Sequence, residues 1–285
     1  MTESTTRLSL AAGAAIDLHL HTIYSDGTWT PEALLDHLVE NQFSLAAIAD
    51  HDRTDKVAEI QQLALEKHLP VLAAVEMSCT WKDEMVDLLC YGFDPGPSAL
   101  ADLAQEIFYR QQENTRAVFA TLLQQGYALP EDKLDIVLAT PSPEQPHALL
   151  DLLKEHGYGL GDPPAGRILG LAGCTYAMNE PAAVVEAAQR SGAACLLAHP
   201  GHGDGFVDFD IQLLDQFRQE APVDGVEVYH PIHTPAKTEL YREYARKNGL
   251  LTSAGSDSHK PDKPPIQYRA ELCRDLLERV GIRVW

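Results

Sequence analysis

Short apolar runs alternate with amphipathic segments along most of the chain. The apolar runs have the length of buried strands, and the segments between them repeat apolar residues at helical spacing. We expect strands at Ile16–His21, Leu45–Ala49, Leu69–Val75, Val86–Tyr91, Ala194–Ala198, Gly225–Val228 and Leu250–Ala254. We expect helices at Pro31–Asn41, Asp55–His68, Pro181–Ser191, Phe209–Glu220, Pro235–Asn248 and Arg269–Val280. This alternation predicts an α/β fold with a largely parallel sheet or barrel.

The middle of the chain has a different pattern. Between Pro97 and Gly166 there is little strand signal, and two helical stretches, Leu100–Gln125 and His147–His156, flank a proline-rich segment. We expect residues 98–166 to form an inserted helical cap, and residues 16–97 and 167–285 to form the α/β domain. Residues 1–15 lack the hydrophobic stretch of a signal peptide, and we expect a disordered tail there.

Composition narrows the classes of function. The formal net charge of −20 disfavours binding of a long nucleic acid, because its phosphates would be repelled. A small anionic substrate is still compatible, since bound divalent cations invert the potential locally. No apolar run is long enough to cross a bilayer. The five cysteines are scattered without a C-x-x-C pair, which favours a reducing, cytoplasmic environment.

Histidines and carboxylates gather where the predicted strands end. His19 and His21 occupy alternate positions of one strand, so both side chains project to the same face. The others are Asp26, Asp50, His51, Asp52, Glu76, His199, Glu227, His230, Asp257 and His259. Active sites of parallel α/β proteins form at the carboxyl ends of strands. Imidazoles with carboxylates suit Zn²⁺, Mn²⁺ or Fe²⁺, so this pattern predicts a metal centre.

Several of these segments resemble the PHP (polymerase and histidinol phosphatase) family of metal-dependent phosphoesterases. The matching segments are DLHLHTIYSDGTWTPEAL, LAAIADHDRT, VEMS, LLAHPG, GVEVYHPIHT and GSDSH, in the order typical of the family. The chain is most similar to the subgroup that acts on nucleoside 3′,5′-bisphosphates and short RNA 5′ ends. That subgroup has a comparable inserted cap, with helices similar to RAVFATLLQQGY and PHALLDLLKEHGY.

The resemblance implies a distorted (β/α)₇ barrel, similar to a TIM barrel, that holds two or three divalent ions. His19, His21, Glu76 and Asp257 would bind one ion, and Asp26, His51 and His259 a second. Glu76 would bridge to a third ion shared with His199. Asp87 stands where the family has a further histidine ligand for this third position. A carboxylate can still ligate such an ion, but the change affects its occupancy or identity.

The resemblance also indicates substrate contacts in the cap. Gln145 precedes Pro146 and His147, where relatives carry an arginine that binds an anion. Gln145 and His147 are therefore candidate substrate contacts, and Arg116 is the best replacement cation, ahead of Arg167. The alternative is that these are ordinary surface residues of the helices and loops.

The expected reaction is hydrolysis of a phosphomonoester by a metal-bound hydroxide, on a small nucleotide substrate. His199 or His230 would protonate the leaving group, and the alternative role of His230 is contact with a substrate phosphate. Glu227 either faces the site or is a buried, hydrogen-bonded carboxylate. The alternatives are a histidinol-phosphate or cyclic-phosphodiester hydrolase, an amidohydrolase-like C–N hydrolase, and a non-catalytic module. The sequence predicts no membrane partner and leaves the oligomeric state open.

Overall fold

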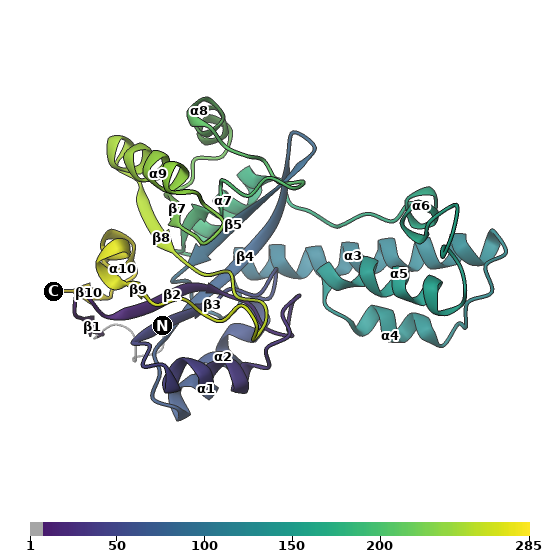
Figure 1. Cartoon of the computed structure of the whole chain (residues 1–285), viewed down its shortest axis with the longest axis horizontal. Coiled ribbons are helices and arrows are strands. Elements are labelled where there is room, and N and C mark those ends of the chain that lie inside the picture. The colour runs from purple at the N-terminus through teal and green to yellow at the C-terminus, as the bar shows by residue number, and fades with distance from the viewer. Residues whose placement is uncertain (1–7) are drawn as a thin grey trace. The chain divides into compact units, whose positions relative to one another are not determined.

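The computed structural model of this protein describes residues 8–285. Its main sheet has eight strands in the order β8-β7-β6-β5-β4-β3-β2-β9, and most neighbours are parallel (Figure 1). All seven strands expected from the sequence are present. The strands are β2 (Ala15–Leu20), β3 (Leu45–Ile48), β4 (Val71–Trp81), β5 (Glu84–Tyr91), β6 (Ala194–Leu197), β7 (Gly225–Tyr229), β8 (Leu251–Ala254) and β9 (Tyr268–Arg269).

The two ends of this sheet meet, so it nearly closes into a barrel. His21 N–H donates to Ser258 O (3.0 Å), and Asp257 N–H donates to His19 O (2.9 Å), which joins β2 to the segment after β8. Gly255 allows this approach, because a Cβ there would lie 2.1 Å from the Cβ of His19. The expectation of a distorted barrel is confirmed.

Strand β5 departs from the parallel arrangement. It pairs antiparallel with both β4 and β6, and the β4–β5 hairpin continues to the Trp81–Glu84 pair. The two loop residues, Lys82 and Asp83, have φ angles of 53° and 64°, as a two-residue type I′ turn requires. This turn lacks the glycine that usually marks such hairpins, which explains why sequence patterning missed it.

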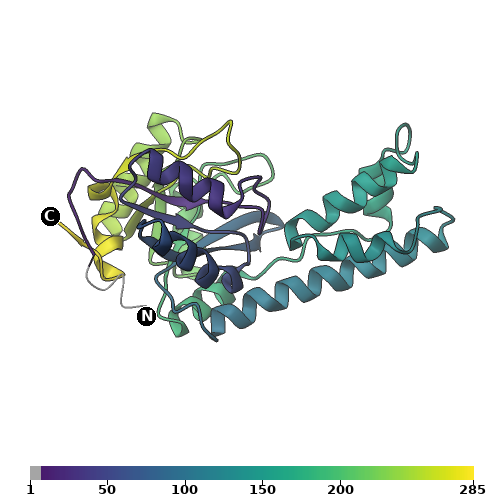
Figure 2. The same ribbon diagram turned by 90° about the horizontal axis from the view of Figure 1, so that it is seen from below.

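Helices cover the outer faces of the barrel sheet (Figures 1 and 2). Helices α1 (Pro31–Glu40) and α2 (Thr54–Glu66) pack on the outward residues of β3, including Ala46 and Ile48. Helices α7 (Pro181–Arg190), α8 (Ile211–Glu220) and α9 (Pro235–Asn248) pack against β4 to β7. Thr30 caps α1 by accepting from Ala33 N–H, and Pro31 occupies the first turn.

The C-terminal segment pairs with the start of the described chain. The predicted helix over residues 269–280 is shorter, and consists of the 3₁₀ turn η2 (Ala270–Cys273) and α10 (Arg274–Arg279). Strand β10 (Arg283–Val284) then pairs with β1 (Ser9–Leu10) in a second, two-stranded sheet. The expectation of a disordered tail to residue 15 is therefore wrong for residues 8–15, because this pairing orders them. Residues 1–7 of the predicted tail lie outside the described residues.

The chain divides into two compact units. One comprises the chain up to Ala104 together with Asn179–Trp285, and the other comprises Gln105–Met178. Helix α3 (Ala99–Gln124) crosses the boundary. The second unit has its own core, formed by α3, α4 (Lys133–Ala139), α5 (Gln145–Glu155) and α6 (Ala165–Leu171), and η1 (Ser142–Glu144) precedes α5. Its boundaries differ from the predicted 98–166, because α3 begins in the first unit and α6 packs on α5. No helix of the described chain combines the length and apolarity needed to cross a membrane.

Candidate metal centre

The first group of converging side chains contains His19, His21, Glu76 and Asp257. His19 and His21 come from the end of β2, Glu76 from β4, and Asp257 from the turn after β8. The Nε2 atoms of His19 and His21 lie 2.9 and 3.1 Å from Glu76 Oε2. The same two atoms lie 3.4 and 3.1 Å from Asp257 Oδ1. The structure thus brings together the four residues predicted for one metal position.

A β-bulge places the two histidines on this face. The register of β2 against β3 shifts between Asp17 and Leu20. Before the shift, Ile16 and Leu18 pack in the core that contains α10, whereas Leu20 packs against α1 and α2. Since a bulge inserts one extra residue, His19 and His21 point toward Glu76 while Asp17 does not.

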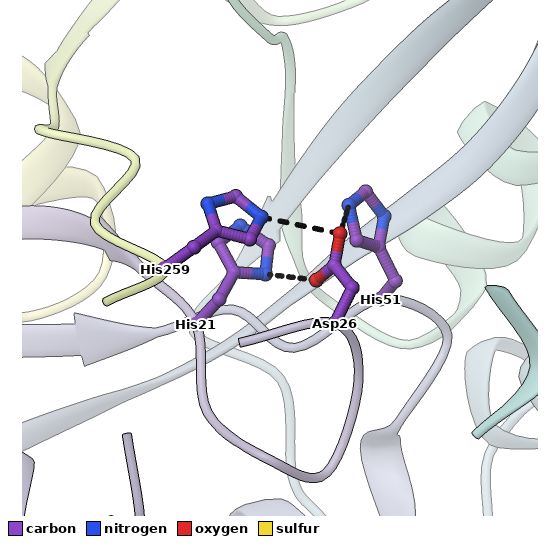
Figure 3. A group of neighbouring side chains, drawn as sticks. All are labelled: His21, Asp26, His51 and His259. Atoms are coloured by element: carbon purple, nitrogen blue, oxygen red, sulfur yellow. Dashed lines mark hydrogen bonds and ion pairs between the residues drawn. The ribbon is translucent and has the colours of Figure 1, made fainter. Parts of the chain in front are cut away.

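The second group contains His21, Asp26, His51 and His259, shown as sticks in Figure 3. Asp26 lies at its centre. Its Oδ2 is 3.2 Å from His259 Nε2 and 3.8 Å from His51 Nε2, and its Oδ1 is 3.6 Å from His21 Nδ1. His51 Nε2 is also 3.3 Å from Glu76 Oε2, so the first and second groups share neighbours.

The third group contains Glu76, Asp87 and His199. His199 Nε2 lies 3.1 Å from Glu76 Oε1 and 3.8 Å from Asp87 Oδ2. Asp87, the residue that departs from the family pattern, is thus buried beside the other two. Glu76 contacts imidazoles through both carboxylate oxygens and connects the three groups.

Backbone strain coincides with these groups. Asp257 has a φ of 54° and His199 a φ of 22°, values that residues with a Cβ seldom adopt. Such a conformation costs on the order of 1 kcal/mol per residue. Non-glycine residues held this way concentrate at functional sites, where surrounding contacts impose the geometry.

The electrostatics of the groups indicate a need for positive charge. Burial alone would raise the pKa of Glu76, but His19 and His51 hold it well below its usual value. Burial and the nearby Glu76 raise the pKa of Asp87 well above its usual value. Burial would lower the pKa of His199, yet Glu76 raises it to about 9. Imidazoles thus stabilise the charge of Glu76, whereas the charge of Asp87 is not compensated, and a divalent cation between the two carboxylates would stabilise both.

The donor set fits metal ions for a second reason. The Nε2 atom of His21 is buried and has no hydrogen-bond partner among the described residues. Two carboxylate oxygens lie 3.1 Å from His21 Nε2, but neither has the alignment of a hydrogen bond. Buried polar atoms are normally paired, so an unpaired nitrogen between carboxylates is consistent with a cation ligand.

His230 reaches the same region from the loop after β7. It is buried, and its Nε2 lies 3.7 Å from Asp257 Oδ2. Its Nδ1 accepts a hydrogen bond from Ile232 N–H (3.2 Å), which leaves the ring proton of the neutral form on Nε2. His230 therefore presents an N–H donor near Asp257.

The three substrate contacts predicted in the insertion all lie in the second unit. Arg116 is exposed on α3, and His147 is exposed on α5, where its Nε2 lies 3.1 Å from Tyr176 Oη. Gln145 instead is fully buried. Its Oε1 accepts from Thr115 Oγ1 (2.8 Å), and its Nε2 donates to Thr140 O (3.2 Å). These bonds give the amide of Gln145 partners inside the unit, an arrangement that favours a structural role over the predicted contact with substrate.

Two carboxylates near the groups have supporting contacts that the sequence did not reveal. Asp50 accepts from Thr22 N–H, Thr22 Oγ1 and Ser25 Oγ, and so holds the loop that carries Asp26. Asp17 accepts from the backbone N–H groups of His19, Ser256 and Ile266. Only their proximity to histidines in the sequence could have pointed to them.

Several known proteins resemble this chain over most of its length. The family model of the PHP domain matches residues 17–161. A 3′,5′-nucleoside bisphosphate phosphatase of Chromobacterium violaceum is 28% identical over 288 residues, which cover 95% of this chain and 98% of that protein. The 5′-3′ exoribonuclease Rnm of Salmonella typhimurium is also 28% identical, with 94% and 92% covered. A phosphoribosyl 1,2-cyclic phosphate 1,2-diphosphodiesterase of Eggerthella lenta is 26% identical, with 85% and 93% covered.

Solved structures share the fold. A candidate metal-dependent phosphoesterase from Bifidobacterium adolescentis has a TM-score of 0.70 at 23% identity, with 93% of this chain and 96% of that one covered. A protein from Chromobacterium violaceum described as an amidohydrolase, with bound sulfate and no metal, also has a TM-score of 0.70. It is 25% identical, with 94% and 97% covered.

Proposed function

Because the chain belongs to the PHP domain family, we propose that it is a metal-dependent phosphoesterase. Its substrate would be the phosphomonoester of a small nucleotide, either a nucleoside 3′,5′-bisphosphate or a short 5′-phosphorylated oligonucleotide. The observation that carries the proposal is the convergence of three histidine–carboxylate groups on Glu76. A phosphatase and an exoribonuclease that match nearly the whole chain support the substrate class.

The residues of each group define the proposed ligands. His19, His21, Glu76 and Asp257 would hold one ion, and Asp26, His51 and His259 a second, while Glu76, Asp87 and His199 would hold a third. We propose two or three ions of Mn²⁺, Zn²⁺ or Fe²⁺, which suit mixed nitrogen and oxygen ligands. When bound, such ions lower the pKa of water and neutralise charge on a phosphoryl group.

His230 is our candidate for the proton donor. The sequence left His199 and His230 as alternatives. His199 directs Nε2 at Glu76, which suits a ligand, whereas His230 carries its proton on a buried Nε2 with no partner among the described residues. As the neutral imidazole, this N–H can donate a hydrogen bond to a phosphate oxygen. To protonate a leaving alkoxide, His230 would first have to take up a second proton on Nδ1, in place of the bond from Ile232 N–H.

The charge of the chain bears on its substrate and partners. The net charge of −20 favours a small phosphorylated molecule over a long nucleic acid. Arg116 and His147 are our candidates for contacts with the substrate, since both are exposed. We also propose a cytoplasmic location, which is supported by five cysteines that are all free thiols.

A phosphate-release screen tests the proposal. Protein loaded with Mn²⁺ would be offered a nucleoside 3′,5′-bisphosphate, a short 5′-phosphorylated RNA, histidinol phosphate and an aryl phosphate. We expect one of the two nucleotide substrates to be hydrolysed fastest, and Asp257→Asn to lose this activity while keeping the melting temperature of chelator-treated wild type. Equal, weak rates on all four substrates would contradict the nucleotide assignment.

A cyclic phosphodiester is the second candidate substrate. It is favoured by the relative from Eggerthella lenta, whose name describes a cyclic phosphate diesterase. Adding a ribose 1,2-cyclic phosphate to the screen distinguishes the two, because ring opening yields a phosphomonoester without free phosphate. Release of an amine from amide substrates, without any phosphoesterase activity, would instead support a C–N hydrolase.

A further inference from the structure

Glu227 on β7 is a fully buried carboxylate whose two oxygens both accept hydrogen bonds. Its Oε1 lies 3.1 Å from Nδ1 of His19. Its Oε2 accepts from the backbone N–H of His199 at 2.8 Å. A single side chain thus contacts two residues that belong to different metal-ligand groups.

The contact with His19 determines which ring nitrogen is available for a metal. Since a carboxylate can only accept, the nitrogen that faces Glu227 carries the ring proton. The other nitrogen, Nε2, lies 2.9 Å from Glu76 Oε2 and 3.4 Å from Asp257 Oδ1, where a cation bound by these carboxylates would take the place of a proton on Nε2. A histidine that donates one N–H to a carboxylate presents its second nitrogen to the metal in a fixed orientation.

The contact with His199 acts on the backbone. His199 has a φ of 22°, an unfavourable value that its surroundings must maintain. Glu227 Oε2 binds the N–H of this residue, directly after β6. The same carboxylate therefore orients the ring of His19 and stabilises the strained backbone from which His199 reaches Glu76.

A direct role of Glu227 as a metal ligand is the alternative, because His19, Glu227 and His230 lie close enough together to surround an ion. Three contacts argue against it. Both oxygens of Glu227 are already hydrogen-bonded, and Nδ1 of His19 is occupied by the same carboxylate. Nδ1 of His230 accepts from Ile232 N–H, so Nε2 of neutral His230 carries a proton and has no free lone pair.

We propose that Glu227 is a positioning residue that keeps the proton of His19 on Nδ1 and holds the backbone of His199. Its removal would therefore weaken metal binding without removing a ligand. The inference rests on the metal-binding part of the proposed function.

The substitution Glu227→Gln tests the proposal, because glutamine retains the shape but has one acceptor and one donor. Whichever way the amide turns, an NH₂ group faces either His19 Nδ1–H or His199 N–H. Glu220→Gln is a matched control, because Glu220 lies on α8, outside the three groups. Its two oxygens also accept hydrogen bonds, from Trp81 Nε1 and Gln216 Nε2. Zn²⁺ affinity is measured by competition with a chelator, and stoichiometry is measured at saturating Zn²⁺.

We expect Glu227→Gln to bind the same number of Zn²⁺ ions with about 10–100-fold lower affinity, the usual effect of losing a partner of a ligand. Glu220→Gln should match the wild type. Loss of one ion at saturation would show that Glu227 is a ligand, and unchanged affinity would show that it positions nothing. Either result overturns the inference, whereas a wild type that binds no Zn²⁺ overturns the proposed function and this inference with it.

A measurement on the wild type keeps the inference testable even if the variant does not fold. In Zn²⁺-loaded protein labelled with ¹⁵N-histidine, long-range ¹H–¹⁵N correlation spectra report which nitrogen of each ring is protonated. We expect His19 to carry a proton on Nδ1 that is protected from exchange with solvent. A proton on Nε2 of His19, or none on Nδ1, overturns the inference.

Discussion

Asp50 provides the sharpest test of how the ligand-bearing loops are held. Its buried carboxylate accepts from Thr22 N–H (2.7 Å), Thr22 Oγ1 (2.7 Å) and Ser25 Oγ (2.8 Å). These bonds fix the loop between His21 and Asp26, which belong to the same metal-ligand group. The substitution Asp50→Ala removes all three bonds and should both destabilise the protein and loosen that group.

The magnitude follows from the contacts. A hydrogen bond to a charged group contributes about 1.5–3 kcal/mol to stability. The Ser25 hydroxyl has a second acceptor in Asp26, at 3.1 Å, so two of the three bonds have no replacement. Two such bonds amount to about 3–6 kcal/mol, and because neighbouring contributions are not additive, we expect a loss of about 3 kcal/mol. Asp50→Asn retains one acceptor and should lose about 1 kcal/mol.

The assay is urea unfolding in the presence of a chelator, followed by Zn²⁺ titration of the folded protein. Asp55→Asn is the control, because Asp55 is exposed and paired with Arg53, and should change stability by less than about 0.5 kcal/mol. Zn²⁺ affinity of Asp50→Ala should fall about 10–100-fold. An Asp50→Ala protein as stable as the control, with wild-type Zn²⁺ affinity, would refute the reasoning.

Three further outcomes are expected. Burial and Glu76 raise the pKa of Asp87, so this residue lowers the stability of the protein once the pH rises above the usual pKa of aspartate. The substitution Asp87→Asn should therefore raise the melting temperature of chelator-treated protein more at about pH 7.5 than at about pH 4, and the variant should bind less metal. Burial lowers the pKa of His233 to about 4, and its ring forms hydrogen bonds with Val228 O and Gly201 N–H. The free energy of unfolding should therefore fall by about 3 kcal/mol as the pH drops from 6.5 toward 4, because the unfolded state takes up the proton first. Urea titrations of His233→Asn should not show this contribution to the pH dependence. When the free metal concentration is about 100 times the Kd, removal of the metal by a chelator should lower the free energy of unfolding by about 2.7 kcal/mol. Calorimetry would record this change as a fall in melting temperature of about 5–10 °C.

Much of the barrel follows from hydrophobic patterning, whereas strand direction does not. Periodicity located every strand that carries a site residue, because each contains a short apolar run of the length of a buried strand. The reversal at Lys82–Asp83 has no glycine or asparagine to mark it, so the sequence predicted a strand at Val86–Tyr91 but not its antiparallel direction. The pairing of β1 with β10 joins residues from opposite ends of the chain, and local sequence carries no signal for it.

The insertion was less predictable than the barrel. Its helices α3 and α5 have clear apolar periodicity, but α4 and α6 are single short elements that depend on packing against them. Packing inside the second unit also explains the environment of Gln145. In the sequence this residue occupies a position that resembles an anion contact, but in the structure it is buried and its amide bridges Thr115 and Thr140 O.

Which carboxylates serve as ligands is decided by strand register, and sequence spacing alone does not reveal it. Asp17, Asp50 and Glu227 accept hydrogen bonds from backbone N–H groups, so their oxygens have partners within the protein. Glu76, in contrast, contacts imidazoles and can exchange their charge for that of a cation. Strict alternation would place Asp17 on the same face as His19 and His21. The bulge in β2 separates them, and a single inserted residue therefore makes Asp17 a support for the loops and the two histidines a pair of candidate ligands.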